Sequence, residues 1–205
     1  MSKRILVTGG TGFIGSHTSI ELMNQGFEPI LIDNFHNSKP DVLEKIEKIT
    51  GKKPIFEQVE MRNAAEMENL FIKYPDIEAV IHFAAVLQVG ESVENPLFYY
   101  SNNLYSTINL LNCMIKYKVN ALVFSSSCTV YGNPDSLPVR ENAPVKEAVS
   151  PYGNTKKICE DIIKDTARIS NIKAINLRYF NPIGAHPSGL LGEVPHGVPT
   201  HLVPY

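Results

Sequence analysis

The stretch Ile5–Gly15 reads ILVTGGTGFIG and decides how the rest of the chain folds. A short apolar run leads into glycines at three-residue spacing, Gly9, Gly12 and Gly15, and a helical pattern follows. This order predicts a strand, a tight turn and a helix whose N-terminal N–H groups can bind a dinucleotide pyrophosphate. Gly9 is expected to allow the turn, Gly12 to admit the phosphates, and Gly15 to let the helix pack closely on the strand.

A carboxylate further along the chain supports the same interpretation. Asp33 follows Gly15 by 18 residues and ends a second apolar run, Ile30–Ile32. A carboxylate at that place accepts hydrogen bonds from the adenosine ribose and disfavours the 2'-phosphate of NADP. The sequence therefore predicts an NAD site. An ordinary glycine-rich turn is the alternative, and the strand, helix and carboxylate around it argue against that.

Composition limits the classes of partner. The 205 residues are 43% hydrophobic and 20% charged, as in ordinary globular proteins, and are enough for one large domain or one and a half. The net charge is −2 without a basic patch, so we expect no binding to nucleic acid. The apolar start breaks at Thr8–Gly10 and is not a signal peptide, and no apolar run is long enough for a bilayer, so no membrane association is expected.

The cysteines and histidines point to neither disulfides nor metals. Cys113, Cys128 and Cys159 are odd in number, far apart and without Cys-x-x-Cys spacing. We expect free thiols in a reducing compartment, the cytoplasm. The six histidines form no pair at helical spacing, and no metal site is expected.

Strand and helix patterns alternate along the chain. Strands are expected from Ile5 and at 29–33, 55–59, 78–83, 121–124 and 174–177, and helices at 13–25, 40–50, 64–73, 96–118 and 151–169. The strands are short and apolar on both faces, which predicts an α/β fold with a doubly wound parallel (Rossmann) sheet and helices on both faces. Ser38 is expected to cap the second helix, and Gly51 to end it.

Two domains are expected. Residues 1–180 would form the NAD-binding Rossmann domain. Residues 181–205 contain five prolines and four glycines with little periodicity, and would begin an incomplete substrate-binding domain.

One tyrosine has the spacing of a catalytic base. Of nine tyrosines, only Tyr152 is followed four residues later by a lysine, Lys156, on the same face of a predicted helix. An ammonium ~4 Å from the phenol, at an effective dielectric of ~20, would lower its pKa by roughly three units and bring it towards neutrality. Such pairs are also common on helix surfaces, so the glycine turn in the same chain is what favours catalysis.

Three serines, Ser125–Ser127, follow the fifth predicted strand. A hydroxyl there could hydrogen-bond a substrate oxygen and pass a proton to the phenolate. The alternative is that small polar residues merely end the strand. Asn102 and Tyr105, on the long predicted helix, are equally compatible with ordinary packing.

Several motifs of the chain resemble those of a known family. The glycine turn and Tyr152-x-x-x-Lys156 resemble the extended short-chain dehydrogenase/reductase superfamily. More specific stretches resemble its UDP-glucose 4-epimerase (UDP-galactose 4-epimerase) family, from Lys3 to Tyr205: VTGGTGFIGSH, DNFHNS, VIHFAA, VGES, PLFYYSNN, FSSSCTVYG, SPYGNTK and LRYFNPIGAHPSG.

The resemblance implies a reaction and its participants. Tightly held NAD would take a hydride from sugar C4 and return it to the other face of the 4-keto sugar, which interconverts UDP-glucose and UDP-galactose. Tyr152 would take the 4-hydroxyl proton, Ser127 would bind the 4-oxygen, and Lys156 would hold the nicotinamide ribose and lower the tyrosine pKa. Tyr152, Ser127, Thr129, Asn181, His201 and Leu202 match substrate positions. The cofactor positions are Gly9, Gly12, Phe13, Ile14, Gly15, Asp33, Asn34, Asn37, Ser38, Glu60, Met61, Phe83, Ala84, Ala85, Leu87, Asn102, Ser125, Tyr152, Lys156 and Tyr179.

Several positions depart from the family pattern. Glu60 replaces an aspartate near the adenine, and Leu87 replaces a lysine near the cofactor, from which we expect weaker NAD retention. His201 replaces an asparagine that contacts the nucleotide. The family's chain continues into the rest of a smaller domain, with an arginine for the diphosphate, so the sequence is expected to be a truncated copy or a fragment.

The helix predicted at 96–118 is apolar around much of its circumference, which indicates burial on more than one side. The family pairs this helix and the helix at 151–169 across a homodimer interface. Burial under the chain's own loops is the alternative.

Two other functions stay open beside the epimerase. One is another nucleotide-sugar enzyme such as a 4,6-dehydratase, disfavoured because Cys128-Thr129 stand where that reaction uses Asp-Glu. The other is an inactive NAD-binding fragment. The intact Ser127, Tyr152 and Lys156 show only that an ancestor was an enzyme.

Overall fold

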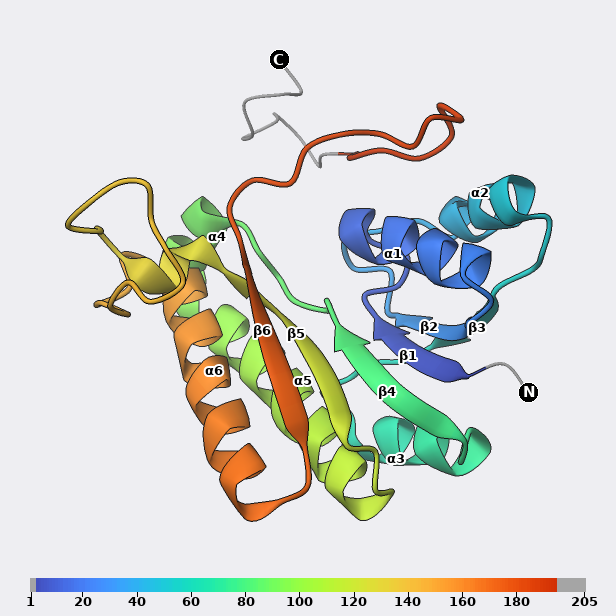
Figure 1. Cartoon of the computed structure of the whole chain (residues 1–205), viewed down its shortest axis with the longest axis horizontal. Coiled ribbons are helices and arrows are strands. Elements are labelled where there is room, and N and C mark those ends of the chain that lie inside the picture. Colours follow the sequence, from blue (N-terminus) through green and yellow to red (C-terminus); the bar gives the residue numbers. More distant parts are fainter. Residues whose placement is uncertain (1–2, 195–205) are drawn as a thin grey trace.

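The computed structural model describes residues 3–194 and contains a single parallel sheet. Its six strands follow the order β3-β2-β1-β4-β5-β6, and every neighbouring pair is parallel (Figure 1). This confirms the predicted doubly wound sheet. The strands are β1 (Arg4–Thr8), β2 (Glu28–Asp33), β3 (Ile55–Gln58), β4 (Ile77–His82), β5 (Ala121–Ser127) and β6 (Lys173–Tyr179).

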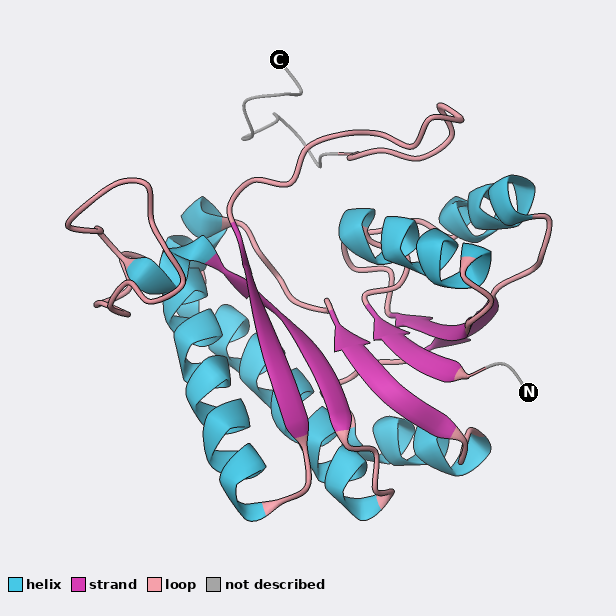
Figure 2. Cartoon of the chain, in the orientation of Figure 1, coloured by secondary structure: helices cyan, strands magenta, loops and turns pink. Residues whose placement is uncertain are grey.

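Helices cover both faces of the sheet (Figure 2). α1 (Phe13–Asn24) and α2 (Asp41–Thr50) lie over β1–β3 on one face, whereas α3 (Ala64–Lys73), α5 (Pro96–Lys116) and α6 (Pro151–Ile169) cover the other. Two short helices lie in connections, α4 (Val89–Glu94) and the 3₁₀ turn η1 (Cys128–Tyr131). No helix within residues 3–194 is long and apolar enough to cross a membrane.

The core has two layers. The larger lies between the sheet and α3, α5 and α6 and includes Leu6, Phe124 and Met114. The smaller lies under α1 and α2, where Leu31 packs with side chains from both helices. Leu191, from the segment that follows β6, is only 5% exposed in this second cluster. That segment therefore crosses the carboxyl edge of the sheet and is anchored on the far side.

The glycine turn has the close approaches that its sequence predicts. Gly9 has φ +66°, and a Cβ there would lie 2.8 Å from the amide nitrogen of Ala84. A Cβ on Gly15 would lie 2.1 Å from the carbonyl oxygen of Gly9. Both distances are shorter than any tolerated contact, so only glycine lets α1 begin directly against the turn.

Two predictions of local structure are wrong. Ser38 does not cap α2, whose N-cap is Pro40 without a side-chain bond, because the Ser38 hydroxyl instead bonds Thr11 and Asp33. The three serines do not follow β5 but belong to it, since parallel pairing with β6 continues as far as Ser127. Gly51 does end α2, in a left-handed conformation with φ 70°.

One edge of the sheet is open on one face, although its strand is as apolar as the sequence predicts. Ile175 and Leu177 of β6 are 62% and 37% exposed. Within the described residues, no helix lies over this face of β5 and β6, because α1 and α2 stand over the other half of the sheet (Figure 1).

We predict that Gly15→Ala lowers the free energy of unfolding by about 3 kcal/mol, because the methyl group meets backbone atoms that cannot move aside. Urea unfolding would measure the change. Gly90→Ala, in α4 with no atom near its added methyl, is the matched control and should be neutral or slightly stabilising. Equal stability of the Gly15→Ala protein and the wild type would contradict the proposed packing.

Candidate active site

The glycine turn lies where the order of the strands reverses. β1 pairs with β2 on one side and with β4 on the other, so the loops after β1 and β4 leave in different directions. Ligands of doubly wound sheets bind in the crevice at this point, beyond the carboxyl ends of the strands. Phe83 and Ala84 follow β4 and contact the turn, through bonds from Phe83 N to Thr8 O (3.1 Å) and Ala84 N to Thr8 Oγ1 (3.2 Å).

The N-terminus of α1 is open to an anion. Gly12 is its N-cap, no described side chain caps it, and no acidic residue occupies its first turn. Phe13 and Ile14 are the first helical residues. Their N–H groups and the positive end of the helix dipole therefore face the crevice and favour a phosphate.

Asp33 connects the loop after β2 to the glycine turn. Its carboxylate accepts hydrogen bonds from Thr11 N (3.3 Å), Phe35 N (2.9 Å) and Ser38 Oγ (3.1 Å). A hydrogen bond of 2.7 Å between the Thr11 and Ser38 hydroxyls closes the ring. The predicted cofactor residues Asp33 and Ser38 are thus fixed beside the turn, whereas Asn34 and Asn37 are exposed in the same loop.

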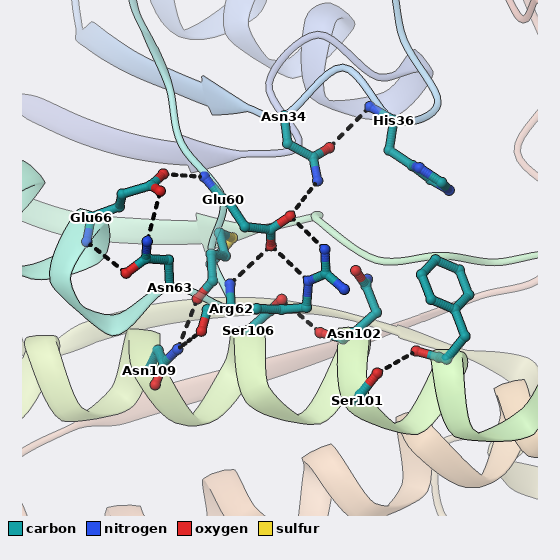
Figure 3. Close-up of polar contacts among 12 residues, drawn as sticks. Asn34, His36, Glu60, Arg62, Asn63, Glu66, Ser101, Asn102, Ser106 and Asn109 are labelled. Atoms are coloured by element: carbon teal, nitrogen blue, oxygen red, sulfur yellow. Dashed lines mark hydrogen bonds and ion pairs between the residues drawn. The ribbon is translucent and has the colours of Figure 1, made fainter.

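The Glu60 carboxylate is already occupied by neighbours of its own chain (Figure 3). Asn34 Nδ2 donates to it at 3.1 Å, and the Arg62 guanidinium donates at 2.9 and 2.8 Å. The hydrogen bonds from Arg62 lower the pKa of Glu60 to about 2, so the group is ionised at neutral pH. The next residue, Met61, is 5% exposed, and its carbonyl accepts from Asn109 of α5.

The first turns of α6 bring Tyr152 and Lys156 against the end of β5. Ser150 caps the helix, accepting from Gly153 N, and Pro151 is the first helical residue, so the sequence fixes where α6 begins. Tyr152 then lies near Ser127, which lowers the pKa of the phenol, and the Ser127 hydroxyl accepts from Thr129 N (3.2 Å) and Thr129 Oγ1 (2.9 Å).

Lys156 is buried under the same strand. Its ammonium donates to the carbonyl of Ser125 at 2.7 Å and lies 5.0 Å from the centre of the Phe124 ring. Burial lowers the pKa of Lys156 to about 8. The centre of the Tyr152 ring is 6.0 Å away.

The structure does not show the predicted lowering of the tyrosine pKa by the lysine. Burial raises the pKa of Tyr152, and the hydrogen bond from Ser127 is what opposes this increase. The ammonium of Lys156 is directed at the Ser125 carbonyl instead of at the phenol, and its own charge is disfavoured by burial. Ser127, and not Lys156, is therefore the neighbour that lowers the pKa of Tyr152.

The remaining predicted site residues lie around the glycine turn or around Tyr152 and Lys156. Tyr179 ends β6 directly beside Ser127 in the sheet register. Asn102 is half-buried on α5, Ala85 is half-buried, and Leu87 is 49% exposed in the connection after β4. Asn181 is exposed after β6. The predicted substrate positions His201 and Leu202 lie outside the described residues.

One residue that the sequence did not single out connects the segment after β4 to the helix of Tyr152. Asn103 is 3% exposed and hydrogen-bonds both the N–H and the C=O of Val86, at 3.0 and 3.1 Å. Its amide also donates to Thr155 of α6 at 3.0 Å. It therefore positions the connection after β4 against the helix of Tyr152. Only its burial distinguishes it from its neighbour Asn102, and burial of one asparagine cannot be deduced from composition.

Residues 3–194 contain no cluster of three His, Cys, Asp or Glu side chains placed to hold a metal ion. A glycine turn at the switch point of a doubly wound sheet, with serine, tyrosine and lysine next to it, defines a dinucleotide-binding protein of the short-chain dehydrogenase/reductase type. Comparison with known proteins places it more closely. The chain belongs to the NAD-dependent epimerase/dehydratase family, whose profile matches residues 5–205.

Individual relatives are similar over nearly the whole chain. A UDP-glucose 4-epimerase of Schizosaccharomyces pombe is 50% identical across 98% of this chain and 58% of its own length, and the human UDP-glucose 4-epimerase is 47% identical across 100% and 61%. A crystal structure of UDP-glucose 4-epimerase from Bifidobacterium longum, in complex with NAD+ and UDP, aligns with a TM-score of 0.95 and 48% identity over 99% of this chain and 61% of that one. The chain thus spans about three fifths of the length of these relatives.

We predict that Lys156→Met stabilises the folded protein at pH 7 by on the order of 1–3 kcal/mol, because a buried ammonium is removed. The lysine pKa is about 8 in the folded chain against 10.5 for the free group. Between these values the unfolded chain binds more protons, so wild-type stability rises with pH there. The advantage of the variant should therefore be complete below pH 8 and shrink towards pH 10.5.

Urea unfolding across pH 6.5–10.5 measures this difference. Lys164→Met, on the exposed side of the same helix, is the matched control and should show no such trend. An advantage that is absent at pH 7, or that grows with pH, would contradict the burial of Lys156.

Proposed function

We propose that this fold binds NAD and interconverts UDP-glucose and UDP-galactose. The observation that supports it most is the grouping of Ser127 and Lys156 with half-buried Tyr152 at the end of β5: Lys156 Nζ donates to the Ser125 carbonyl and lies 6.0 Å from the centre of the Tyr152 ring. The identity of 47–50% to UDP-glucose 4-epimerases adds the substrate, which the geometry alone does not specify.

The residues present fit the cofactor. A side chain on Gly9 or Gly15 would collide with backbone, and the uncapped start of α1 is suited to a pyrophosphate. Asp33 suits a ribose with free hydroxyls, and Lys156 suits the second ribose. NAD, when bound, accepts a hydride from sugar C4 and returns it. Leu87 offers no charge to it, which supports weaker retention of the cofactor than a lysine would give.

The chain's own side chains handle the proton. In the proposed reaction Tyr152, as phenolate, accepts the proton of the sugar 4-hydroxyl and later gives it back. Ser127 holds the 4-oxygen and stabilises the phenolate, as its effect on the tyrosine pKa supports. Ser127 and Lys156 are buried and Tyr152 is half-buried, which limits the access of water to the transfer. Thr129 orients Ser127, and Asn181 extends the site towards the nucleotide.

Two alternatives differ in their chemistry. A nucleotide-sugar dehydratase needs a further acid and base at the start of η1, where Cys128 and Thr129 stand, and burial raises the pKa of the Cys128 thiol. A cofactor-binding fragment without turnover is the other alternative, because the relatives are longer.

We propose that residues 1–180 are the NAD-binding domain and that 181–205 begin the nucleotide-sugar domain. The exposed apolar face of β6 supports a further layer there.

The state of the cysteines supports a cytoplasmic location. All three cysteines are free, and two of them are buried, which suits a reducing cytoplasm.

α5 and α6 lie side by side, and Tyr105 and Ile115 of α5 are 57% and 46% exposed. We propose that these helices meet their copies across a homodimer interface.

For the activity, we predict that the protein with added NAD converts UDP-galactose to UDP-glucose and that Tyr152→Phe slows this by at least about 10²-fold, because the base is lost. Proton NMR of the anomeric signal measures it. Tyr74→Phe, whose hydroxyl bonds Glu57 far from the site in the fold, is the matched control and should be fully active. Conversion that survives Tyr152→Phe would contradict the mechanism.

Other products of the same experiment separate the alternatives. A 4-keto-6-deoxy sugar would identify a dehydratase. Bound NAD without any conversion would identify a cofactor-binding fragment and refute the proposed activity of this chain.

For the assembly, we predict a dimer in sedimentation velocity at micromolar concentration, and a monomer after Tyr105→Glu, because the added charge would be desolvated without a partner in the proposed interface. Ile72→Glu is the matched control: this residue of α3 is 59% exposed, and its substitution should leave the dimer intact. A monomeric wild type would refute the interface.

A further inference from the structure

We propose that Glu160 and Arg178 form a positioning pair that sets the separation of Ser127 and Tyr152. The inference rests on the proposed function and adds residues to it, since neither side chain was expected in the site from the sequence. Neither would touch the sugar or the cofactor. Their effect on the reaction would come from the elements they hold together.

Glu160 is buried, Arg178 is half-buried, and their ion pair has the geometry of a fork. Arg178 Nε donates to Glu160 Oε1 at 2.9 Å, and Nη2 donates to Oε2 at 2.6 Å. Glu160 is 8% exposed, and the guanidinium carbon lies 4.8 Å from the centre of the Tyr131 ring. Two parallel charge-assisted bonds fix both distance and direction, which a single contact cannot do. Glu160 raises the pKa of Arg178, so its charge is permanent.

A third partner extends the pair to the strand of the reacting serine. Ser126 Oγ donates to Glu160 Oε1 at 2.5 Å. In the sheet register Ser126 lies opposite Arg178, and Ser127 lies opposite Tyr179. Because side chains alternate along a strand, Ser126 points towards α6 while its neighbours Ser125 and Ser127 point the other way. Ser126 is therefore engaged with the pair and is not one of the hydroxyls offered to a substrate.

Every element that carries a reacting group is attached to this pair. Glu160 lies on α6, one turn after Lys156 and two turns after Tyr152. Ser126 adjoins Ser127 on β5, and Arg178 adjoins Tyr179 on β6. Tyr131, under the guanidinium, ends η1, the turn that contains Thr129. The helix of the base and the strand of the serine thus have a common fixed point.

The chemical consequence follows from the sensitivity of proton transfer to geometry. A misplacement of about 1 Å between reacting groups can reduce a rate by about 10²-fold. Tyr152 and Ser127 lie where α6 begins and β5 ends, and the Ser126–Glu160 bond joins the same two elements next to them. Loosening this bond lets Ser127 and Tyr152 move apart without unfolding either element.

The variants are chosen to separate positioning from folding. Ser126→Ala removes the link to β5 and leaves the ion pair, so it should fold. Glu160→Gln keeps the shape and one acceptor but removes the charge, and Arg178→Lys keeps the charge but removes the fork. Glu68→Gln is the matched control, because it removes the same charge from a surface pair with Lys116 on α3 and α5.

We expect kcat for UDP-galactose to fall about 10-fold in Ser126→Ala and about 10²-fold in Glu160→Gln. KM and the amount of bound NAD should stay at the wild-type value, and Glu68→Gln should match the wild type throughout. The kcat of Arg178→Lys should lie between those of Ser126→Ala and Glu160→Gln. A proportional loss of NAD, or a rise in KM with kcat unchanged, would contradict a positioning role.

A second readout does not depend on turnover. With tyrosines labelled by 13C at Cζ, the Tyr152 signal is assigned from Tyr152→Phe and titrated with pH. Because Ser127 lowers the pKa of Tyr152, a greater separation of the two in Ser126→Ala should raise that pKa. Cys128, Lys156 and Tyr99 also act on or lie near this phenol, so their ionisation must be followed in the same titration.

The two readouts fail in different ways. If the wild type binds NAD but converts no sugar, the proposed function fails while the titration still tests the pair. If the wild type is active but Ser126→Ala changes neither kcat nor the Tyr152 titration, the proposed function stands and the positioning role is refuted.

Discussion

The close contact between Gly15 and the carbonyl of Gly9 is the constraint on which the site depends. A Cβ on Gly15 would lie 2.1 Å from that oxygen, so the helix can start there only because the residue has no side chain. The contact aims the open N-terminus of α1 at the carboxyl edge of the sheet, where β1 and β4 part. Backbone sterics in this one turn thus create the anion site.

A chain of buried polar groups connects this turn to the rest of the molecule. Thr8, which ends β1, bonds His82 Nδ1 at 2.7 Å, and His82 Nε2 lies 3.2 Å from the Thr107 hydroxyl of α5. Burial lowers the pKa of His82 to about 3, so the ring stays neutral and can serve both partners. Thr107 in turn donates to the carbonyl of Asn103, which holds the helix of Tyr152 through Thr155. The cofactor side and the tyrosine side are therefore connected without a break.

The sequence predicts those parts of the fold that local chemistry decides. The alternation of apolar runs with helical patterns suffices for the sheet, Gly9 and Gly15 for the turn, and Ser150-Pro151 for the start of α6. What it does not predict depends on contacts between distant segments. Ser38 has the local pattern of an N-cap, yet a partner in the glycine turn takes its hydroxyl.

The same limit applies to the candidate site. The spacing of Tyr152 and Lys156 predicts one helix face, but the direction of the ammonium depends on the Ser125 carbonyl, which β5 brings from another part of the chain. The length of β5 depends on its pairing with β6, which extends the strand through all three serines. Whether a serine faces substrate or α6 follows only from that register.

The most direct test of this account is calorimetric titration of the purified chain, freed of nucleotide, with NAD and with NADP. The account predicts one NAD per chain, and binding of NADP at least about tenfold weaker because its 2'-phosphate meets the carboxylate of Asp33. Asp33→Asn should narrow that difference. Absence of NAD binding, or equal binding of the two nucleotides, would contradict the claim that this turn and Asp33 form an NAD site.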